Sequence, residues 1–342
     1  MSETGPGGGT RAAANPRAEQ SATERILVIR LGALGDFVLS LGPFAAIRKH
    51  HETAHITLLT SAPYADLARA CGAFDDVWVD ERPTMWQIGR WLALRSKLRG
   101  GHFARVYDLQ TSDRSGAYFR LLGLGGPWGP GRRPEWSGIA PGASHPDTNP
   151  ERNQIHTIER QREQLRLAGI AHVPLADLSW AQADLERFDL EPPYALIVPG
   201  GAPHRPEKRW PLSYFVDIAS RLAARGLQPV VIGGKPEVAL GVEITAACAP
   251  ACDLTGQTDF QDIAVLARGA KVALGNDTGP MHLIALACCP SVVLFSGASD
   301  PARTAPRAPE RAVPVAVLRE DDLAALDVNT VWAAVAEAAA IV

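Results

Sequence analysis

The sequence has almost no net charge and no long apolar run, and each of these shortages excludes a class of protein. Its 34 Lys and Arg residues nearly balance 37 Asp and Glu residues, for a formal net charge of −3, which removes the overall electrostatic reason to bind nucleic acid. The longest strongly apolar run without charge, Leu283–Phe295, contains Pro290 and is shorter than the roughly 18–20 residues of a membrane span. We therefore predict neither a nucleic-acid partner nor a transmembrane helix.

Cysteine pairs and metal-binding motifs are also scarce. The five cysteines are odd in number, and the pairs Cys248/Cys252 and Cys288/Cys289 lack the Cys-x-x-Cys and histidine spacing of a zinc site. No Asp-x-Asp motif occurs. We expect buried free thiols in a reducing cytoplasm, and neither a metal nor another cofactor.

Apolar residues are plentiful and follow an alternating α/β pattern. They make up 46% of the 342 residues, enough for two cored domains. Short β-branched runs alternate with helical periodicity, which predicts parallel sheets covered by helices. We expect a disordered tail over 1–23, which lacks the apolar segment of a secretory signal, an N-terminal domain over 24–175, a C-terminal domain over 176–325, and a helix over 326–342. This helix could pack back on either domain, and we choose the N-terminal domain.

The predicted strands are Ile26–Arg30, His55–Thr60, Asp76–Asp80, Ala104–Leu109, Tyr194–Val198, Gln228–Ile232, Lys271–Gly275 and Ser291–Phe295. The pattern also predicts a single helix over Phe37–Lys49 and, because of its glycines and prolines, a long irregular loop over Gly125–Pro150. Ligands of open α/β sheets bind beyond the carboxyl ends of the strands, so we expect a cleft to which both domains contribute.

The first candidate site is the loop after the first strand, Arg30-Leu-Gly-Ala-Leu-Gly-Asp36. Its two glycines lack the Gly-x-Gly-x-x-Gly spacing of a dinucleotide fold, which disfavours an NAD-dependent oxidoreductase. Asp36 stands at the start of a helix, where a carboxylate either caps the helix or, facing a cleft, acts as a general base. The residues alone leave both interpretations open.

The second candidate site is Gly275-Asn-Asp-Thr-Gly-Pro-Met-His282, between a strand and a helix. Thr278 can donate its hydroxyl group, Gly279 allows close approach of a phosphate, and the helix N-terminus carries partial positive charge. These features outline a diphosphate site. An ordinary turn capped by Asp277 or Thr278, with His282 packed in the core, explains the same residues.

The third and fourth candidates are two more loops of the C-terminal domain. In PGGAPHRPEKRWP, Lys208 could neutralise a leaving diphosphate, a ligand that we expect to be its partner in place of a protein carboxylate, or it could be a solvated surface lysine. After the next strand, Glu237 could bind ribose hydroxyls or cap a helix. Acceptor-side candidates are weaker: Gln110, Arg114, Arg132 and Arg133 could meet an anionic glycan or simply confer solubility.

Three stretches resemble glycosyltransferase family 9, the ADP-heptose:lipopolysaccharide heptosyltransferases. They are IRLGALGDFVLSLGPFAAIR, PGGAPHRPEKRWP and LTGQTDFQDIAVLARGAKVALGNDTGPMHLIALA, and the helix IHTIERQREQLRLAGI is similar to one that closes the family's first domain. The resemblance implies a GT-B fold, two Rossmann-like domains that bind the acceptor on the first and a nucleotide-sugar on the second. It covers about Arg25 to Phe295. The segment PGGAPH departs from the family's usual small polar residue, which leaves the donor contacts of that loop open.

The resemblance also implies roles for individual residues. Asp36 matches the catalytic aspartate, Lys208 the lysine at the donor diphosphate, and Glu237 lies near the ribose-binding acid. Asp277, Thr278, Gly279 and His282 match the donor loop. The implied reaction transfers a heptose from ADP-heptose to a lipopolysaccharide inner-core acceptor, with inversion and without a metal. A single base suffices for inversion, whereas a retaining hydrolase would need two flanking carboxylates.

Two alternatives stay open: a glycosyltransferase with another nucleotide-sugar or acceptor, and a non-catalytic nucleotide-binding module. A lipid-linked acceptor further predicts peripheral contact with the inner membrane. Basic and aromatic residues that could lie at lipid headgroups occur at Trp128, Arg132, Arg133 and Trp136, and at Trp86, Arg90, Trp91 and Arg95. Packing of these tryptophans inside the protein explains them equally well.

Overall fold

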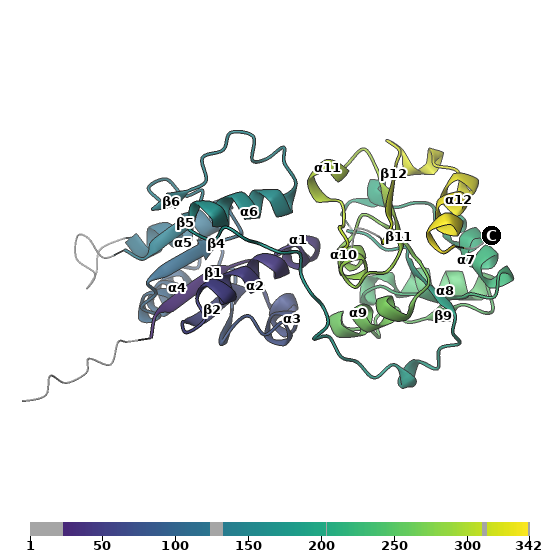
Figure 1. Cartoon of the computed structure of the whole chain (residues 1–342), viewed down its shortest axis with the longest axis horizontal. Coiled ribbons are helices and arrows are strands. Elements are labelled where there is room, and N and C mark those ends of the chain that lie inside the picture. The colour runs from purple at the N-terminus through teal and green to yellow at the C-terminus, as the bar shows by residue number, and fades with distance from the viewer. Residues whose placement is uncertain (1–22, 124–132, 203, 310–312, 341–342) are drawn as a thin grey trace, which may run out of the picture.

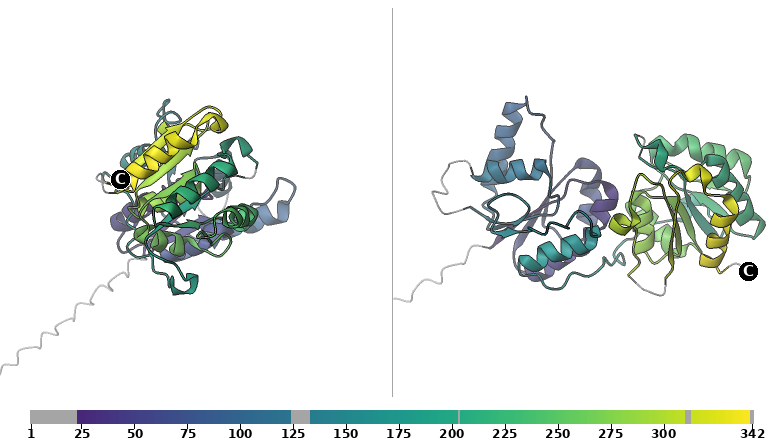
Figure 2. Two further views of the ribbon diagram at one scale, coloured as in Figure 1. Left: turned by 90° about the vertical axis from the view of Figure 1, so that its right-hand side faces the viewer. Right: turned by 90° about the horizontal axis from the view of Figure 1, so that it is seen from above.

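The computed structural model describes residues 23–123, 133–202, 204–309 and 313–340, which form two lobes that lie side by side (Figure 1). Within these ranges each lobe contains a six-stranded parallel sheet, ordered β3-β2-β1-β4-β5-β6 in the first and β12-β11-β10-β7-β8-β9 in the second. The predicted α/β class and the arrangement of two similar domains across a cleft are confirmed. Seen from above, the two lobes touch over a narrow region (Figure 2, right panel).

The strands of the first sheet are β1 (Arg25–Ile29), β2 (His55–Thr60), β3 (Asp76–Val79), β4 (Arg105–Asp108), β5 (Glu135–Gly138) and β6 (His145–Pro146). Those of the second are β7 (Tyr194–Val198), β8 (Gln228–Val231), β9 (Cys252–Asp253), β10 (Ala273–Asn276), β11 (Ser291–Phe295) and β12 (Val315–Arg319). The helices of the first domain are α1 (Leu34–Val38), α2 (Leu41–His50), α3 (Ala65–Ala70), α4 (Ile88–Gly100), α5 (Asp113–Gly123) and α6 (Thr157–Leu167). The second domain contains α7 (Leu212–Ala224), α8 (Val238–Ala247), α9 (Phe260–Gly269), α10 (Gly279–Leu286), α11 (Pro301–Thr304) and α12 (Val328–Ala338).

Both faces of the first sheet are buried, which explains why β1 is apolar at every inner position. Ile26 and Val28 pack into one hydrophobic cluster, and Leu27 and Ile29 into another on the opposite face. A parallel sheet covered by helices on both sides requires such continuous apolar strands. The first of these clusters continues into the second domain, so a shared apolar core joins the two lobes.

The predicted single helix over Phe37–Lys49 is wrong, because the chain forms two helices with a break at Leu39 and Ser40. Pro43 lies at the third position of α2. A proline has no backbone N–H to donate, and its ring collides with the carbonyl four residues earlier, which here belongs to Leu39. The break leaves α1 as a short separate helix that faces the second domain (Figure 1).

The predicted irregular loop over Gly125–Pro150 is also wrong in part, because β5 and β6 extend the first sheet from within it. Trp136 on β5 is 1% exposed and packs edge to face on Phe119, so it cannot contact lipid. Trp128, Arg132 and residues 1–22 of the predicted tail over 1–23 lie outside the described residues. The C-terminal helix α12 packs on β11, β12 and α7, so the expectation that it returns to the N-terminal domain is wrong.

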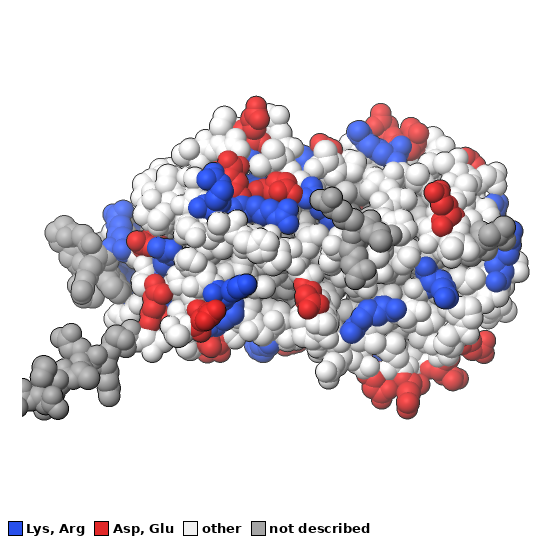
Figure 3. Space-filling view, in the orientation of Figure 1, with Lys and Arg blue, Asp and Glu red and all other residues white. Residues whose placement is uncertain are grey.

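Basic and acidic side chains are interspersed on the face shown in Figure 3, in keeping with the near balance of charge in the sequence. None of the helices in the described ranges has the length and apolar character needed to cross a membrane.

Candidate active site

The loop after β1 carries Asp36 into the space between the domains. Gly32 has φ +117°, and a Cβ there would lie 2.4 Å from the ring of Tyr64, so the turn requires glycine. Ala33 occupies the N-cap position of α1, and Asp36 is the third residue of the helix. The capping interpretation of Asp36 is therefore wrong. Its side chain is 38% exposed.

A buried arginine holds the Asp36 carboxylate. Arg30 is 2% exposed, and its Nη2 lies 3.3 Å from Asp36 Oδ1 while its Nη1 donates to the carbonyl of Leu109. Burial lowers the pKa of Arg30 and raises the pKa of its neighbour Asp108 to about 6. Arginine stays protonated at neutral pH in spite of such a shift, so Asp36 faces a fixed positive charge.

The loop after β10 and the loop after β7 are joined by one side chain of the second domain. Asn276 accepts a hydrogen bond from the backbone N–H of Trp210 at 3.0 Å and donates to the carbonyls of Pro199 and Gly200 at 2.9 and 3.1 Å. Thr278 then forms the N-cap of α10, with Gly279 as the first residue of the helix. The N–H of Gly279 has no carbonyl one turn earlier to bond within the helix, whereas Pro280 has no N–H and Met281 donates to the carbonyl of Thr278 at 3.2 Å.

Lys208 has a protein partner, which corrects the expectation that only a ligand would pair with it. Its Nζ lies 2.5 Å from Asp277 Oδ2, and the two side chains are 13% and 9% exposed. Lys208 is therefore not a solvated surface lysine. The pair brings the loop after β7 and the start of α10 together, at the place where the sequence predicts a diphosphate.

His282 packs where the two domains touch. It is 4% exposed, and burial lowers its pKa to about 4, so it is neutral at neutral pH. A Cβ on Gly35 would lie 2.9 Å from the His282 ring, and a Cβ on Gly279 would lie 2.5 Å from Leu34 Cγ. Glycine at both positions lets α1 and α10 pack directly against each other.

Glu237 ends a short 3₁₀ turn beside the same loops. Its Oε2 accepts a hydrogen bond from the backbone N–H of Gly234 at 2.8 Å, which is the capping role that the sequence left open. The side chain also lies close to Gly200, where a Cβ would be 2.6 Å from Glu237 Cγ. This carboxylate is thus fixed at the edge of the candidate site.

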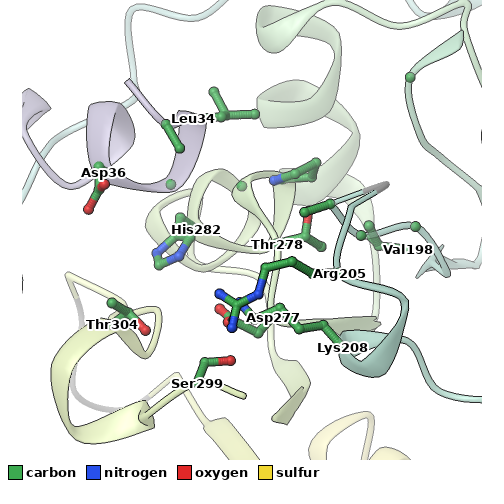
Figure 4. A pocket seen from close by; sticks show the side chains of 18 of the residues that line it. Leu34, Asp36, Val198, Arg205, Lys208, Asp277, Thr278, His282, Ser299 and Thr304 are labelled. Carbon is green, nitrogen blue, oxygen red and sulfur yellow. The ribbon is translucent and has the colours of Figure 1, made fainter. Parts of the chain in front are cut away.

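These residues line one cavity of about 820 Å³ between the domains. Its wall includes Asp36, Lys208, Glu237, Asp277, Thr278, Gly279 and His282, which are the predicted catalytic and donor-side residues. Figure 4 shows Asp36 on the helix of the first domain, across from Asp277 and Lys208. Within the described ranges, no three His, Cys, Asp or Glu side chains gather so that they could hold a metal ion.

Of the four acceptor-side candidates, Arg132 lies outside the described residues, and Gln110, Arg114 and Arg133 do not line this cavity. Gln110 Oε1 accepts a hydrogen bond from the backbone N–H of Leu31 at 2.8 Å and so supports the loop that carries Asp36. Arg114 lies over the Trp91 ring at 5.8 Å and donates to the carbonyl of Pro83 at 3.3 Å. Both side chains are engaged with the protein.

The cavity also contains residues to which the sequence analysis gave no role. Arg205 points its guanidinium group into the cavity beside Asp277 (Figure 4) and donates to the carbonyl of Ala298 at 2.7 Å. Arg303 and Tyr64 line other parts of the wall. Arg205 could have been noticed as a second cation three residues before Lys208, whereas the sequence around Arg303 carries no comparable signal.

Comparison with known proteins gives consistent matches. The sequence model of Glycosyltransferase family 9 (heptosyltransferase) matches residues 91–323. Lipopolysaccharide heptosyltransferase 2 of Salmonella typhimurium and that of Escherichia coli are each 34% identical to this chain over 111 residues. These alignments cover 31% of this chain and 32% of each relative, so the chain matches about a third of the length of these relatives.

Solved structures extend the likeness to almost the whole fold. E. coli ADP-heptose lps heptosyltransferase II gives a TM-score of 0.74 at 22% identity, covering 92% of this chain and 98% of that one. E. coli heptosyltransferase WaaC with ADP gives a TM-score of 0.70 at 19% identity, covering 92% and 99%. At these identities the match shows the shared fold.

Proposed function

Because this chain belongs to glycosyltransferase family 9, the heptosyltransferase family, we propose that it transfers a heptose from ADP-heptose to a lipopolysaccharide inner-core acceptor, with inversion and without a metal. The observation that carries the proposal is the cavity. It combines a carboxylate on one domain, Asp36, with a cation and a helix N-terminus on the other, Lys208 and the start of α10.

In the proposed reaction, Asp36 is the general base. The acceptor hydroxyl oxygen attacks the anomeric carbon of the heptose, and its proton passes to the Asp36 carboxylate. The bond from the anomeric carbon to the diphosphate oxygen breaks, and its electron pair leaves on ADP. Arg30 supports this role because it holds the carboxylate in place from the buried side, 3.3 Å away.

Lys208, Thr278 and Gly279 would stabilise the departing diphosphate. The Lys208 ammonium group supplies a compact positive charge, and the N-terminus of α10, with the N–H of Gly279, adds partial positive charge at the same cavity. Asp277 holds Lys208 in position before the donor binds. Glu237, fixed by Gly234 at the cavity edge, is our candidate for the ribose hydroxyls.

The test is the variant Asp36→Asn, which keeps the size of the side chain and removes the base. We expect ADP binding, measured by calorimetry, to be nearly unchanged and transfer to fall about 10²–10⁴-fold. Asp75→Asn is a matched control, because Asp75 is also ion-paired with an arginine and 43% exposed but does not line the cavity. Normal turnover by Asp36→Asn would refute the assignment of the base.

A nucleotide-binding module without activity would need only the second-domain half of this cavity. The partly exposed carboxylate of Asp36 on the opposite wall favours the enzyme. Calorimetry with ADP and UDP separates the proposed donor from another nucleotide-sugar, since only the matching diphosphate should bind tightly. Tight binding of either nucleotide with no transfer to any glycan acceptor would support the module.

The partners of the proposed enzyme are then a nucleotide-sugar and a lipid-linked glycan, and not a nucleic acid. An enzyme with these substrates would work in the cytoplasm, peripherally at the inner membrane, where the acceptor is anchored. The curated relatives are named for lipopolysaccharide, which supports this class of acceptor. Extraction of the native protein with the membrane fraction at low salt, and its release at high salt, would test the location.

A further inference from the structure

A group of large apolar side chains at the start of α4 is exposed to solvent. Met85, Trp86, Ile88 and Leu92 are 80%, 86%, 68% and 57% exposed, the four highest values among the large apolar side chains that the structure describes. They fall within eight consecutive residues. We call these four side chains the apolar ridge. Single exposed apolar residues are common on protein surfaces, but a cluster of this kind marks an interaction site.

The helix that follows the ridge is strongly basic. α4 contains Arg90, Arg95, Lys97 and Arg99 and no acidic residue, although the chain as a whole has a net charge of −3. Arg90 and Lys97 are exposed, and the nearest acid to Arg90, Glu81, lies 3.9 Å from it and is also exposed. Apolar and basic side chains together fit a surface that is apolar inside and negatively charged outside.

The ridge begins at the same edge of the first sheet as the loop that carries Asp36 into the cavity. The sheet is parallel, so the loops after β1, β3 and β4 leave the same edge, and they carry Asp36, the ridge and Gln110 respectively. Trp91 turns inward from α4 and packs against Tyr118 and Arg114 on α5, which fixes the helix to the domain. Seen from above, α4, drawn in blue, projects outward from the first lobe (Figure 2, right panel).

We propose that the apolar ridge and α4 dock this protein on an anionic lipid bilayer, with Met85, Trp86 and Ile88 inserted among the acyl chains and Arg90 and Lys97 at the headgroups. The docking itself is inferred from the ridge and α4. Only its purpose, which is to bring a lipid-linked acceptor to the cavity, rests on the proposed function. A projecting, convex ridge flanked by cations fits an interface of lipids, where tryptophan is favoured. Of the two segments that the sequence analysis names for membrane contact, it keeps the one with Trp86 and Arg90 and leaves out the one with Trp136, which is buried.

Vesicles without acceptor or donor test this docking independently of the enzymatic activity. The wild type should sediment with vesicles of phosphatidylcholine and phosphatidylglycerol, and much less with phosphatidylcholine alone. Met85→Ser/Trp86→Ser/Ile88→Ser should weaken binding about tenfold or more because it removes the inserted apolar area. Arg90→Gln/Lys97→Gln should weaken it by about fivefold for each charge removed.

The matched control is Val238→Ser/Val242→Ser, which removes two apolar side chains that are 41% and 56% exposed on α8 of the other domain. It should bind vesicles like the wild type. All variants should keep wild-type ADP affinity by calorimetry, and wild-type turnover with a water-soluble acceptor lacking acyl chains. If the wild type binds anionic vesicles but transfers no heptose, the result counts against the proposed function and leaves the docking proposal intact.

Three results would overturn the docking proposal. These are absence of wild-type binding to anionic vesicles, equal binding by the ridge variant, and equal loss in the α8 control. A fourth would replace the lipid by another occupant: if the wild type dimerises in analytical ultracentrifugation and the ridge variant does not, the ridge is the interface between two copies of this chain.

Discussion

The pair formed by Lys208 and Asp277 makes a prediction in which stability and ligand binding can be separated. Lys208→Met keeps most of the apolar stem and removes the ammonium group. The remaining Asp277 carboxylate, 9% exposed, then has lost the cation 2.5 Å away. Removing one partner of a largely buried pair costs about 3–5 kcal/mol of unfolding free energy, which for a domain of this size corresponds to a lower Tm by roughly 6–20 °C.

The assay is urea unfolding of the full chain, with two further variants as controls. Arg69→Met breaks a pair whose side chains are 57% and 95% exposed and should change the unfolding free energy by less than about 0.5 kcal/mol. Lys208→Met/Asp277→Asn leaves no uncompensated charge, so it should be more stable than Lys208→Met alone. An unchanged unfolding free energy in Lys208→Met would show that the pair does not form in solution.

The same variants test whether Lys208 also reaches a ligand. If its ammonium group binds the diphosphate, Lys208→Met should weaken ADP binding by about 10–100-fold, which corresponds to the 1.5–3 kcal/mol of a hydrogen bond to a charged group. Calorimetry at a temperature where all variants are folded measures this. Wild-type ADP affinity combined with lost stability would give Lys208 a structural role alone and refute its part in the proposed reaction.

Three further predictions concern the domain contact, a buried acid and metals. Gly279→Ala places a Cβ 2.5 Å from Leu34 Cγ and 2.7 Å from Leu34 Cβ, and it should lower transfer about tenfold by opposing the contact of α1 with α10. Leu34→Gly removes both atoms and should restore transfer in the double variant, whereas lack of rescue would assign the loss to donor binding. Burial raises the pKa of Asp108 to about 6, so its protonated form stabilises the fold below its ordinary pKa and that contribution is lost as pH rises through about 6. The stability of Asp108→Asn relative to wild type, measured by unfolding, should therefore rise by about 2 kcal/mol between pH 4 and pH 7, and a difference independent of pH would contradict this. Transfer should survive EDTA, because Lys208 and the start of α10 supply positive charge at the leaving diphosphate; loss of activity that Mg²⁺ restores would contradict the proposed leaving-group chemistry.

The sequence predicted the central strands well because burial on both faces of a parallel sheet leaves a continuous apolar run. β2, β7 and β11 begin and end where the pattern places them. β5 and β6 were missed because they are four and two residues long and are surrounded by glycine and proline. The strand conformation of β5 depends on pairing with β4, and that of β6 on pairing with β5, which no local pattern reveals.

For the candidate site too, features with a local sequence signal could be predicted and contacts between distant segments could not. Loops at the carboxyl ends of strands could be located from sequence, because strand, turn and helix signals are local, and the structure brings seven of the predicted residues to one cavity. Pairings between loops could not be located. Lys208 and Asp277 are 69 residues apart, and Arg30, an arginine at the end of an apolar strand, gave no signal that it would be buried behind Asp36.

These pairings explain how the cavity could receive a diphosphate without an added cation. The four acids that line the cavity each have a partner in the protein: Arg30 for Asp36, Lys208 for Asp277, the N–H of Gly234 for Glu237 and the N–H of Ala302 for Asp300. The two acids with a cationic partner, Asp36 and Asp277, therefore add little repulsion for an anionic ligand. Arg205, Arg303 and the first turn of α10 contribute further positive charge to the same wall. His282 stays neutral beneath Gly35 because of its burial, so the contact between the domains can close over a charged donor without burying a further ion.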